Sequence, residues 1–463
     1  MNHLNETLDP SRTAAFPEGF LWGAATSAAQ IEGSPLADGA GASIWHRFAR
    51  VPGAIAGGDT PDVACDHYRR FRDDVAAMRD LGLTAYRFSI AWGRVLPDGT
   101  GRVNERGLDF YRRLVDALLE AGIAPFATLY HWDLPAALDD RGGWLNRDVA
   151  GWFADYATVC YRALGGGVRS WATINEPWVV SDGGYRAGVL APGRRSLQEA
   201  ARAAHHLLLA HGTAIAAGRA EGVRELGLVV NIEPKHPASE RPEDLATARR
   251  ADAYMNRQFA DPALLGVYPE ELAEVYAPDW QQTWAEVRPG DLETIRAPLD
   301  WLGINYYTRA VVRHDPSVEP DGAGRVRQEQ HLYTETDWEV WPDGLRETLV
   351  WAHRRYGGIP LAVTENGAAL ADPPSPVGGR VDDPLRVAYL RDHLRAVAQA
   401  IREGADVRAY CAWSLLDNFE WSHGYAKRFG LLHVDYTTQQ RTPKSSARFY
   451  ADVIASNGAV LTR

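Results

Sequence analysis

SWATINEPW, residues 170–178, is an apolar, β-rich run that ends abruptly in polar residues. The run predicts a buried strand, but Asn175 and Glu176 follow it, and Pro177 forbids its continuation in a hydrogen-bonded ladder. A carboxylate at such a strand end is either a solvated loop residue or a working acid, because burying an unpaired carboxylate is costly. The choice depends on whether the rest of the chain supplies Glu176 with a partner.

Seven other stretches share this short, apolar, β-rich pattern, and helical segments alternate with them, as βαβ units require. Eight strands, each followed by a helix or loop, predict an α/β fold with one (β/α)8 barrel, whose active site lies at the C-terminal ends of the strands. The strand stretches are FLWGAA (20–25), TAYRFSI (84–90), APFATLY (124–130), SWATINE (170–176), LGLVVNIE (226–233), DWLGINYY (300–307), PLAVTEN (360–366) and VRAYCAWSLL (407–416).

Apolar residues recur at three- and four-residue steps between these stretches, which predicts helices over 68–82, 108–118 and 390–401. No sustained linker divides the chain, so we expect a single (β/α)8 domain over 1–463, with residues 1–15 as a disordered tail. Segments rich in Gly, Pro and Asp predict long surface loops at 51–62, 314–326 and 371–384.

Composition argues against several function classes. The net charge is −11, and no basic cluster with interleaved aromatic residues appears, so a nucleic-acid partner is not expected. The N-terminus lacks an apolar signal core, and no apolar run approaches the length of a membrane span. Three widely spaced cysteines without a CxxC motif predict buried thiols in a reducing compartment. We therefore expect a cytoplasmic protein; the cysteines are Cys65, Cys160 and Cys411.

Polar and aromatic residues stand at the ends of six predicted strands, where the barrel fold brings them to one face. Among them, Glu365 of VTENG gives Glu176 its partner. Two facing carboxyls can hydrolyse a glycosidic bond: one protonates the leaving oxygen, while the other attacks carbon or activates water. A gap of roughly 5–5.5 Å gives retention of configuration, and roughly 6.5–9.5 Å gives inversion.

Ordered motifs across nearly the whole chain carry a family resemblance. They are YRFSIAW, TLYHWDLP, TINEP, LGINYYT, VTENG and WSLLDNFEW, between FPEGFLWGAATSAAQIEG (16–33) and RTPKSSARFY (441–450). With this set, the chain resembles the retaining β-glucosidases of glycoside hydrolase family 1. Two local departures from the family pattern are Ala29, where an aromatic residue is common, and Gly93, which replaces a frequent proline.

The resemblance implies roles for individual residues. Glu176 would be the general acid/base and Glu365 the nucleophile, with Arg87 and Tyr307 holding Glu365 ionised. A negatively charged Glu365 should raise the pKa of Glu176 and keep it protonated. The implied substrate-binding residues are Gln30, His131, Trp132, Asn175, Asn305, Trp413, which would stack under the sugar ring, Glu420, Trp421, Trp178 on the aglycone side, and Phe429.

The function implied is hydrolysis of terminal β-D-glucosyl residues of β-glucosides and cellobiose-like oligosaccharides, as in cellulose degradation, with side activity on β-galactosides and β-fucosides. Two alternatives stay open: a 6-phospho-β-glycosidase, and a non-catalytic sugar-binding barrel. The spacing of His205, His206 and His211 does not place three ligands on one helix face, so no metal is expected. No cofactor is expected either, the partner is a small-molecule β-glucoside, and a homo-oligomer stays open.

Overall fold

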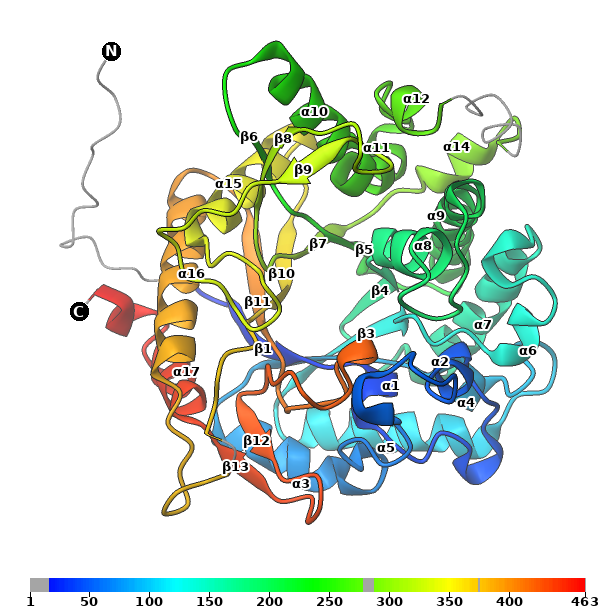
Figure 1. Cartoon of the computed structure of the whole chain (residues 1–463). Coiled ribbons are helices and arrows are strands. Elements are labelled where there is room, and N and C mark those ends of the chain that lie inside the picture. The colour runs from blue at the N-terminus through cyan, green and yellow to red at the C-terminus, as the bar shows by residue number, and fades with distance from the viewer. Residues whose placement is uncertain (1–15, 278–286, 374, 463) are drawn as a thin grey trace.

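Eight parallel strands close into a barrel in the computed structural model, which describes residues 16–277, 287–373 and 375–462 (Figure 1). Each strand lies within one of the eight predicted stretches, so the predicted fold class is confirmed. The order around the barrel is β1-β11-β10-β7-β5-β4-β3-β2. The strands are β1 (Leu21–Ala25), β2 (Ala85–Ser89), β3 (Ala124–Tyr130), β4 (Ser170–Asn175), β5 (Leu226–Asn231), β7 (Trp301–Asn305), β10 (Leu361–Asn366) and β11 (Val407–Trp413). The predicted tail, 1–15, lies outside the described residues.

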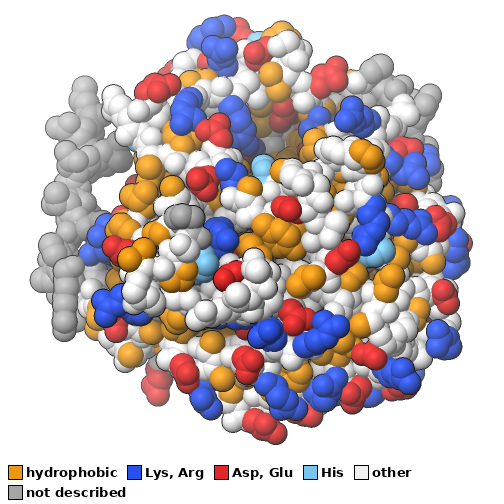
Figure 2. Space-filling view, turned by 60° about the horizontal axis from the view of Figure 1, so that its bottom comes forward, with side chains coloured by type: hydrophobic (Ala, Val, Ile, Leu, Met, Phe, Trp, Pro, Cys, Tyr) orange, Lys and Arg blue, Asp and Glu red, His pale blue; other side chains and the backbone are white. Residues whose placement is uncertain are grey.

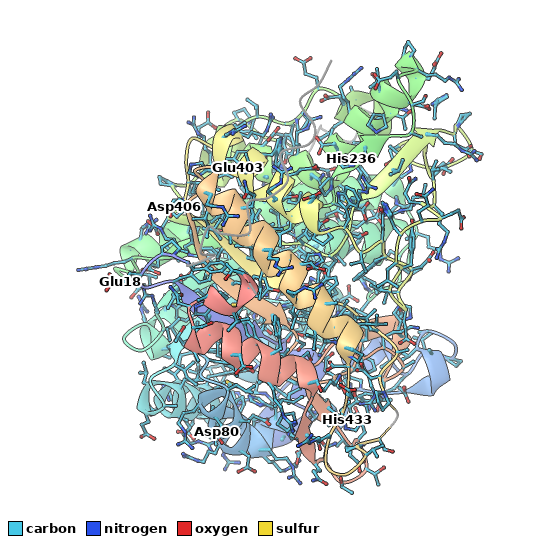
Figure 3. All side chains as sticks on the ribbon, turned by 90° about the vertical axis from the view of Figure 1, so that its left-hand side faces the viewer. Glu18, Asp80, His236, Glu403, Asp406 and His433 are labelled. Atoms are coloured by element: carbon cyan, nitrogen blue, oxygen red, sulfur yellow. The ribbon has the colours of Figure 1, made fainter. Side chains whose placement is uncertain are left out.

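Long helices surround the barrel, and their apolar faces cover the outer side of the strands, except for the helix at Pro242–Asp252, which packs on short strands outside the barrel (Figure 1). Three of them, α3, α5 and α16, correspond to the segments predicted from helical periodicity, although α3 ends at Asp80, two residues before the predicted end. Helices α16 and α17 pack side by side on the outside (Figure 3). The long helices are α3 (His67–Asp80), α5 (Glu105–Glu120), α7 (Val149–Leu164), α9 (Leu197–Ala220), α10 (Pro242–Asp252), α11 (Gln258–Leu265), α15 (Pro342–Arg355), α16 (Pro384–Arg402) and α17 (Ser445–Ala455).

Shorter elements decorate the loops. The short α-helices are α1 (Ala28–Ile31), α2 (Ile44–Phe48), α4 (Trp92–Val95), α6 (Ala136–Asp139), α8 (Pro177–Ser181), α12 (Leu272–Val275) and α14 (Asp291–Ile295). The 3-10 helices are η1 (Ala37–Gly39), η2 (Ala56–Gly58), η3 (Gly143–Leu145), η7 (Trp421–His423) and η8 (Ala459–Thr462), and the π-helices are η4 (Asp182–Arg186) and η5 (Ala253–Arg257).

Two small sheets lie outside the barrel, and one corrects a prediction. Strand β6 (Lys235–Pro237) pairs with β8 (Ala310–His314), which pairs with β9 (Ala323–Arg325). The stretch 314–326, predicted as a surface loop, therefore contains β9. This strand has only three residues, of which one is buried and lacks a side chain, so no alternation of apolar and polar residues marked it in the sequence. The second sheet pairs β12 (Leu432–Val434) with β13 (Arg441–Pro443).

A layer of side chains from all eight strands fills the barrel interior. Small alanines surround the rings of Phe126 and Trp301, which gives the packed core expected of such a barrel. Polar groups lie beyond this layer, towards the C-terminal ends of the strands. On β2, for example, Ala85 belongs to the apolar layer, and Arg87 stands two residues further along the strand. The layer consists of Leu21, Ala85, Ala124, Phe126, Ala172, Val229, Trp301, Ala362 and Ala409.

The outer surface carries charges of both signs. On the face shown in Figure 2, acidic and basic side chains are interspersed with smaller apolar areas. None of the helices in the described ranges is both long and apolar enough to cross a bilayer. The three cysteines are free and buried, as the sequence predicts.

Candidate active site

The end of β4 answers the question raised by TINEPW. Glu176 adopts a left-handed backbone conformation with φ of +48°, and Pro177 occupies the start of α8. The backbone N–H of Glu176 still donates to the Val229 carbonyl at 2.9 Å, so the residue stays tied to β5 while the chain turns. Proline fits the first turn of a helix, where its missing N–H has no partner to lose. The turn leaves the Glu176 side chain almost fully buried, at 5% exposure.

Glu365, at the end of β10, accepts hydrogen bonds from two side chains, one on β2 and the other just after β7. Arg87 of β2 donates to Glu365 Oε1, and the Tyr307 hydroxyl donates to Oε2 at 2.6 Å. Both oxygens of this buried carboxylate therefore have a partner, and one partner is a cation. The next residue but one, Gly367, leaves room for β11, because a Cβ there would lie 1.7 Å from the Trp413 carbonyl oxygen.

Two asparagine amides join Glu176 to this cluster. Asn305 Nδ2 donates to Glu176 Oε1 at 2.7 Å and to Asn175 Oδ1 at 3.0 Å. Asn175 Oδ1 also accepts from Arg87 at 2.7 Å. The structure thus links the two glutamates through residues that come from β2, β4, β7 and β10.

Burial and mutual repulsion set the protonation of the pair. Burial, followed by the negative charge of Glu365, raises the pKa of Glu176 to about 8. Burial also raises the pKa of Glu365, but Arg87 and Tyr307 oppose that rise. Since Glu176 receives only an amide hydrogen bond, it is the member of the pair that holds the proton near neutral pH.

The hydrogen-bond pattern fixes the tautomer of His131. Because Asn175 Oδ1 already accepts from Arg87 and Asn305, the Asn175 amide presents its Nδ2 donor to His131 Nε2, at 3.2 Å. Burial, with Arg87 nearby, lowers the pKa of His131 well below its usual value, so the ring is neutral. Nε2 then accepts and Nδ1 carries the proton. Nδ1 is buried and has no partner among the described residues, so it is available to donate to a sugar hydroxyl.

Aromatic rings form one wall of the site. His131 stacks at 5.9 Å from Trp413 and at 6.1 Å from Trp421, and Trp132 lies 4.6 Å from Trp421. Trp132 Nε1 also donates to the Asn175 carbonyl at 3.0 Å, which holds the loop after β3 against the end of β4. Flat, half-polar rings of this kind suit the C–H faces of a sugar.

Gln30 is held by its neighbours on both sides. Its amide nitrogen donates to the Phe419 carbonyl at 3.0 Å and to Asn418 Oδ1 at 3.2 Å, while its oxygen accepts from Ser27 at 2.6 Å. These bonds tie the loop after β1 to the loop after β11. They occupy both amide hydrogens, so in this arrangement Gln30 can offer a ligand only its remaining oxygen lone pair.

Glu420 lies near the glutamate pair with an unused oxygen. Its Oε2 atom is buried and has no hydrogen-bond partner among the described residues. Burial, followed by the charge of Glu365, raises the pKa of Glu420 to about 8. A buried polar oxygen without a partner costs free energy, on the order of 1–3 kcal/mol, which a hydroxyl-bearing ligand would recover.

The two remaining predicted residues, Trp178 and Phe429, pack among other aromatic side chains. Trp178 is half-buried, follows Glu176 on α8 and packs in a cluster with Tyr254 and Tyr268. Phe429 is buried, with ring contacts to Tyr307 at 6.3 Å and to Trp338 at 6.2 Å. Their predicted contact with substrate stays a prediction.

Three neighbours of the site were missed by the sequence reasoning. Thr364 donates to Asn305 Oδ1 at 2.6 Å, which orients the amide between the glutamates. Trp338 lies 5.1 Å from Tyr307, and Trp45 lies 4.4 Å from Trp421. Thr364 precedes Glu365 in VTENG and could have been found there. Trp338 lies in a loop and Trp45 on the short helix α2, and neither stands in a recognisable sequence pattern.

The histidines of α9 have partners within the fold. His205 pairs with Asp291 at 2.9 Å, His206 with the Trp144 carbonyl at 2.8 Å, and His211 with the Thr173 hydroxyl. In the described ranges of the chain, no group of three or more His, Cys, Asp or Glu side chains could hold a metal ion.

The chain is similar to known proteins over most of its length. A family model described as glycosyl hydrolase family 1 matches residues 12–459. Beta-glucosidase A of Thermotoga maritima is 47% identical over 449 residues, covering 96% of this chain and 98% of the relative. A bifunctional beta-D-glucosidase/beta-D-fucosidase of Bifidobacterium breve is 45% identical over 466 residues, covering 96% and 100%. The solved structure of a family 1 β-glucosidase from Thermotoga maritima matches with a TM-score of 0.93 at 46% identity, covering 96% of this chain and 99% of that one.

Proposed function

This chain belongs to glycosyl hydrolase family 1, and from that premise we propose that it is a retaining β-glucosidase, which removes terminal β-D-glucosyl residues from β-glucosides and short oligosaccharides. One observation carries the proposal furthest. The buried Glu365 carboxylate is held by Arg87 and Tyr307, and Glu176 joins the same network through Asn305. A sugar-binding protein without catalysis has no need of such a pair, which disfavours the non-catalytic alternative.

In the first step, Glu365 attacks the anomeric carbon and the glycosidic C–O bond breaks. Glu176 gives its proton to the departing oxygen, so the aglycone leaves as a neutral alcohol and Glu176 becomes a carboxylate. The glucosyl group is then bound covalently to Glu365 through an ester. The raised pKa of Glu176 supports this role, because the acid must hold its proton at the working pH.

In the second step, water replaces the aglycone. Glu176, now ionised, takes a proton from this water as it attacks the anomeric carbon, and the ester bond to Glu365 breaks. Two inversions give glucose with its β configuration retained. Since Glu365 is neutral while it carries the sugar, the repulsion that raised the pKa of Glu176 is absent, which suits Glu176 to act as a base.

A direct test is hydrolysis of a chromogenic β-glucoside by purified protein, with the anomer of the first product followed by NMR. β-Glucose as the first product supports the retaining mechanism. α-Glucose would refute it, and absence of hydrolysis on any β-glycoside would favour the non-catalytic barrel.

The alkaline limb of the pH profile should report Glu176. The pKa of Glu176 is about 8, so the acid is protonated below that pH, and kcat/KM for cellobiose should fall as pH rises through about 8. The Glu176→Gln variant, whose side chain does not titrate, should lose this limb in its residual activity on cellobiose. Glu420→Gln serves as the control and should keep it. A limb that vanishes with Glu420→Gln and survives Glu176→Gln would contradict the assignment.

Glu420 should make the enzyme select neutral sugars over 6-phosphosugars. The family members that hydrolyse phosphosugars carry Ser at this position, followed by Lys and Tyr. Here Lys427 is present but Glu420 and Phe429 occupy the other two positions. A phosphate dianion at this position would be repelled by the negative charge of Glu365, and also by Glu420 at pH values above its pKa of about 8, and like-charge contacts of this kind cost several kcal/mol. Arg428, close in sequence, is already committed to Asp417 at 2.7 Å.

The expected result is a kcat/KM for cellobiose at least ~100-fold above that for cellobiose 6-phosphate, since each 1.4 kcal/mol is about a tenfold difference. Glu420→Ser should lose activity on neutral glucosides and gain slight activity on phosphosugars. Glu420→Gln, which removes charge and keeps shape, is the matched control. A wild-type preference for the 6-phosphate would overturn the neutral-sugar proposal in favour of a 6-phospho-β-glycosidase.

Further proposals concern the substrate range, the location and the assembly of the protein. We propose that the enzyme also hydrolyses β-fucosides and β-galactosides, more slowly than β-glucosides. The Bifidobacterium breve relative, which is named as a bifunctional glucosidase and fucosidase, supports the activity on β-fucosides. Cellobiose-like substrates suggest a place in cellulose degradation, and the three free, buried thiols suit a cytoplasmic location. We also propose that residues 1–463 act as one domain, and that any homo-oligomer leaves the strand ends open to substrate.

A further inference from the structure

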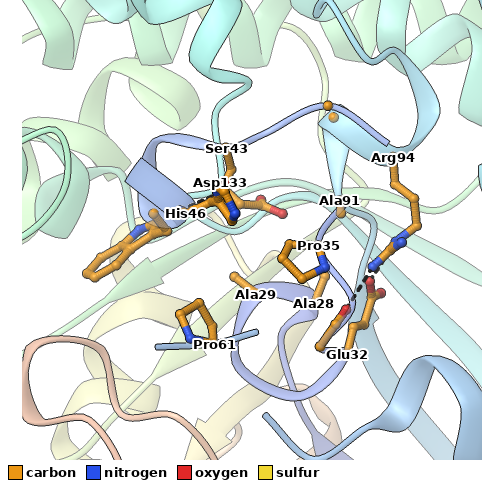
Figure 4. Close-up of a pocket in the computed structure, with 14 residues that line it drawn as sticks. Ala28, Ala29, Glu32, Pro35, Ser43, His46, Pro61, Ala91, Arg94 and Asp133 are labelled. Atoms are coloured by element: carbon orange, nitrogen blue, oxygen red, sulfur yellow. Dashed lines mark hydrogen bonds and ion pairs between the residues drawn. The ribbon is translucent and has the colours of Figure 1, made fainter. Parts of the chain in front are cut away.

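A cavity of about 50 Å³ lies beside the sugar site, between the loops that follow β1, β2 and β3 (Figure 4). Neither Glu176, Glu365 nor Glu420 lines it. Half-buried residues, including Ala29 and His46, line its wall, and it is partly open to solvent. Its lining also includes Ala28, Glu32, Gly33, Pro35, Gly41, Ser43, Trp45, Pro61, Ala91, Gly93, Arg94 and Asp133.

Two buried polar atoms in this lining lack partners. Asp133 Oδ1 and Trp45 Nε1 make no hydrogen bond within the described part of the chain, although their side chains are 3% and 1% exposed. Buried polar groups in native proteins are nearly always paired, and each unpaired one costs roughly 1–3 kcal/mol. One of the two atoms is a donor and the other belongs to a carboxyl group. A ligand that pairs both atoms would have to accept a hydrogen bond from the Trp45 indole and exchange one with the Asp133 carboxyl.

The charges in the lining cancel. Glu32 accepts from Arg94 Nε at 2.9 Å and from the Tyr111 hydroxyl at 2.8 Å. The rest of the Arg94 guanidinium donates to the carbonyls of Ser34 and Gly33. Burial, together with Glu32, raises the pKa of Asp133 to about 8, and burial lowers the pKa of His46, so both are mainly neutral at pH 7. An ionic ligand would find no unpaired opposite charge here.

The wall is built from small residues at a crossing of two backbones. The Gly41 N–H donates to the Gly93 carbonyl at 2.8 Å, and a Cβ on Gly93 would lie 2.7 Å from the Gly41 oxygen. A Cβ on Gly41 would lie 1.9 Å from the Pro97 oxygen. Both departures from the family pattern, Ala29 and Gly93, thus lie in this one wall, where a bulkier residue would take up the space.

We infer that this cavity binds a small neutral polyol of about three carbon atoms. One hydroxyl accepts from the Trp45 indole N–H, another exchanges a hydrogen bond with the Asp133 carboxyl, and the C–H groups contact the alanine and proline wall. A cavity of this size and polarity would otherwise hold a few ordered waters, which a polyol replaces with equivalent hydrogen bonds. The ligand would lie behind the sugar-site wall, since Trp45 packs 4.4 Å from Trp421 and Ala29 precedes Gln30.

Glycerol is the probe, and the Trp45 indole N–H is the reporter. Protein labelled with ¹⁵N-tryptophan gives one indole signal for each of the 16 tryptophans, and Trp45→Phe identifies the signal of interest. Glycerol should shift the Trp45 signal saturably. Ala29→Leu, which fills the cavity, should weaken this response at least tenfold, and Ala29→Val gives a milder filling if the leucine variant does not fold. Asp133→Asn, a neutral near-isostere, should keep the response, and Asp133→Leu should lose it.

Trehalose at matched osmolality is the control for general solvent effects, because it is too large for the cavity. A response to glycerol that is linear, or shared by all indoles, would mean that only solvent changes are sensed and would overturn the proposal. A Trp45 response unchanged in the filled variants would place glycerol elsewhere. A saturable response to ammonium chloride but not to glycerol would replace the polyol with a cation, and the inference would be wrong.

Discussion

Replacing Glu365 with alanine is expected to lower kcat/KM for β-glucosides on the order of 10⁵-fold, a loss comparable to removal of a covalent nucleophile in other enzymes. This corresponds to about 7 kcal/mol of lost transition-state stabilisation. The effect should be this large because alanine cannot form the glycosyl ester, and Arg87 and Tyr307, which fix the position and charge of Glu365, have no carboxylate to hold in the variant. The measurement is kcat/KM for an aryl β-glucoside and for cellobiose.

The same variant also tests how the charge of Glu365 affects the pKa of Glu176. Without the negative Glu365, the pKa of Glu176 should fall, so the alkaline limb of the residual activity should move to lower pH. Azide, entering from the vacated side, should give an α-glycosyl azide. In the wild type, a fluorinated mechanism-based glucoside should label Glu365 itself.

Glu18→Ala is the matched control, since Glu18 is an exposed carboxylate on the outside of the protein (Figure 3). It should leave every one of these measurements unchanged. Labelling of a residue other than Glu365, or a loss below about tenfold in Glu365→Ala, would remove Glu365 from the nucleophile role.

The strands of the barrel were predictable because parallel strands are buried on both faces and read as continuous apolar runs. SWATIN is buried at every position, and its polar end was visible as Asn175 and Glu176. Strand ends were less predictable: the predicted run extends from 407 to 416, but the barrel strand ends at Trp413, and Leu416 instead forms a bridge with Leu432. The surface strand β9 has little buried side chain, so its sequence carries no comparable pattern.

Residue types at the site were readable from the sequence, but their hydrogen bonds were not. Asn305 could be placed at a strand end, yet its donation to Glu176 depends on how Thr364 and Asn175 orient its amide. Such an arrangement needs side chains from three strands to be placed together. The same holds for the unpaired Asp133 oxygen, which becomes visible only when three loops enclose a cavity.

Glu176→Ala should separate substrates by their leaving groups. For cellobiose, whose alcohol must be protonated as it leaves, kcat/KM should fall roughly 10³-fold, within the range of general acid catalysis. For a dinitrophenyl β-glucoside, whose leaving group needs no proton, kcat/KM should change little. The second step still needs a base, so kcat for this substrate should fall, and KM should fall with it as the glycosyl-enzyme accumulates.

Azide tests the base role in the same variant. It attacks without giving up a proton, so it needs no general base, and it should restore kcat for the aryl substrate and yield a β-glycosyl azide. The configuration of the azide product distinguishes the two variants. In Glu176→Ala the sugar is first bound to Glu365, so azide displaces it and gives a β-glycosyl azide. In Glu365→Ala azide attacks the substrate directly from the opposite face and gives an α-glycosyl azide. Glu176→Gln, which keeps the Asn305 contact but cannot transfer a proton, should behave like Glu176→Ala. Equal losses on both substrates without azide rescue would mean that Glu176 only holds Asn305 in place and is not the general acid. The general acid would then be Glu420, the other buried carboxyl near Glu365, whose pKa is also about 8.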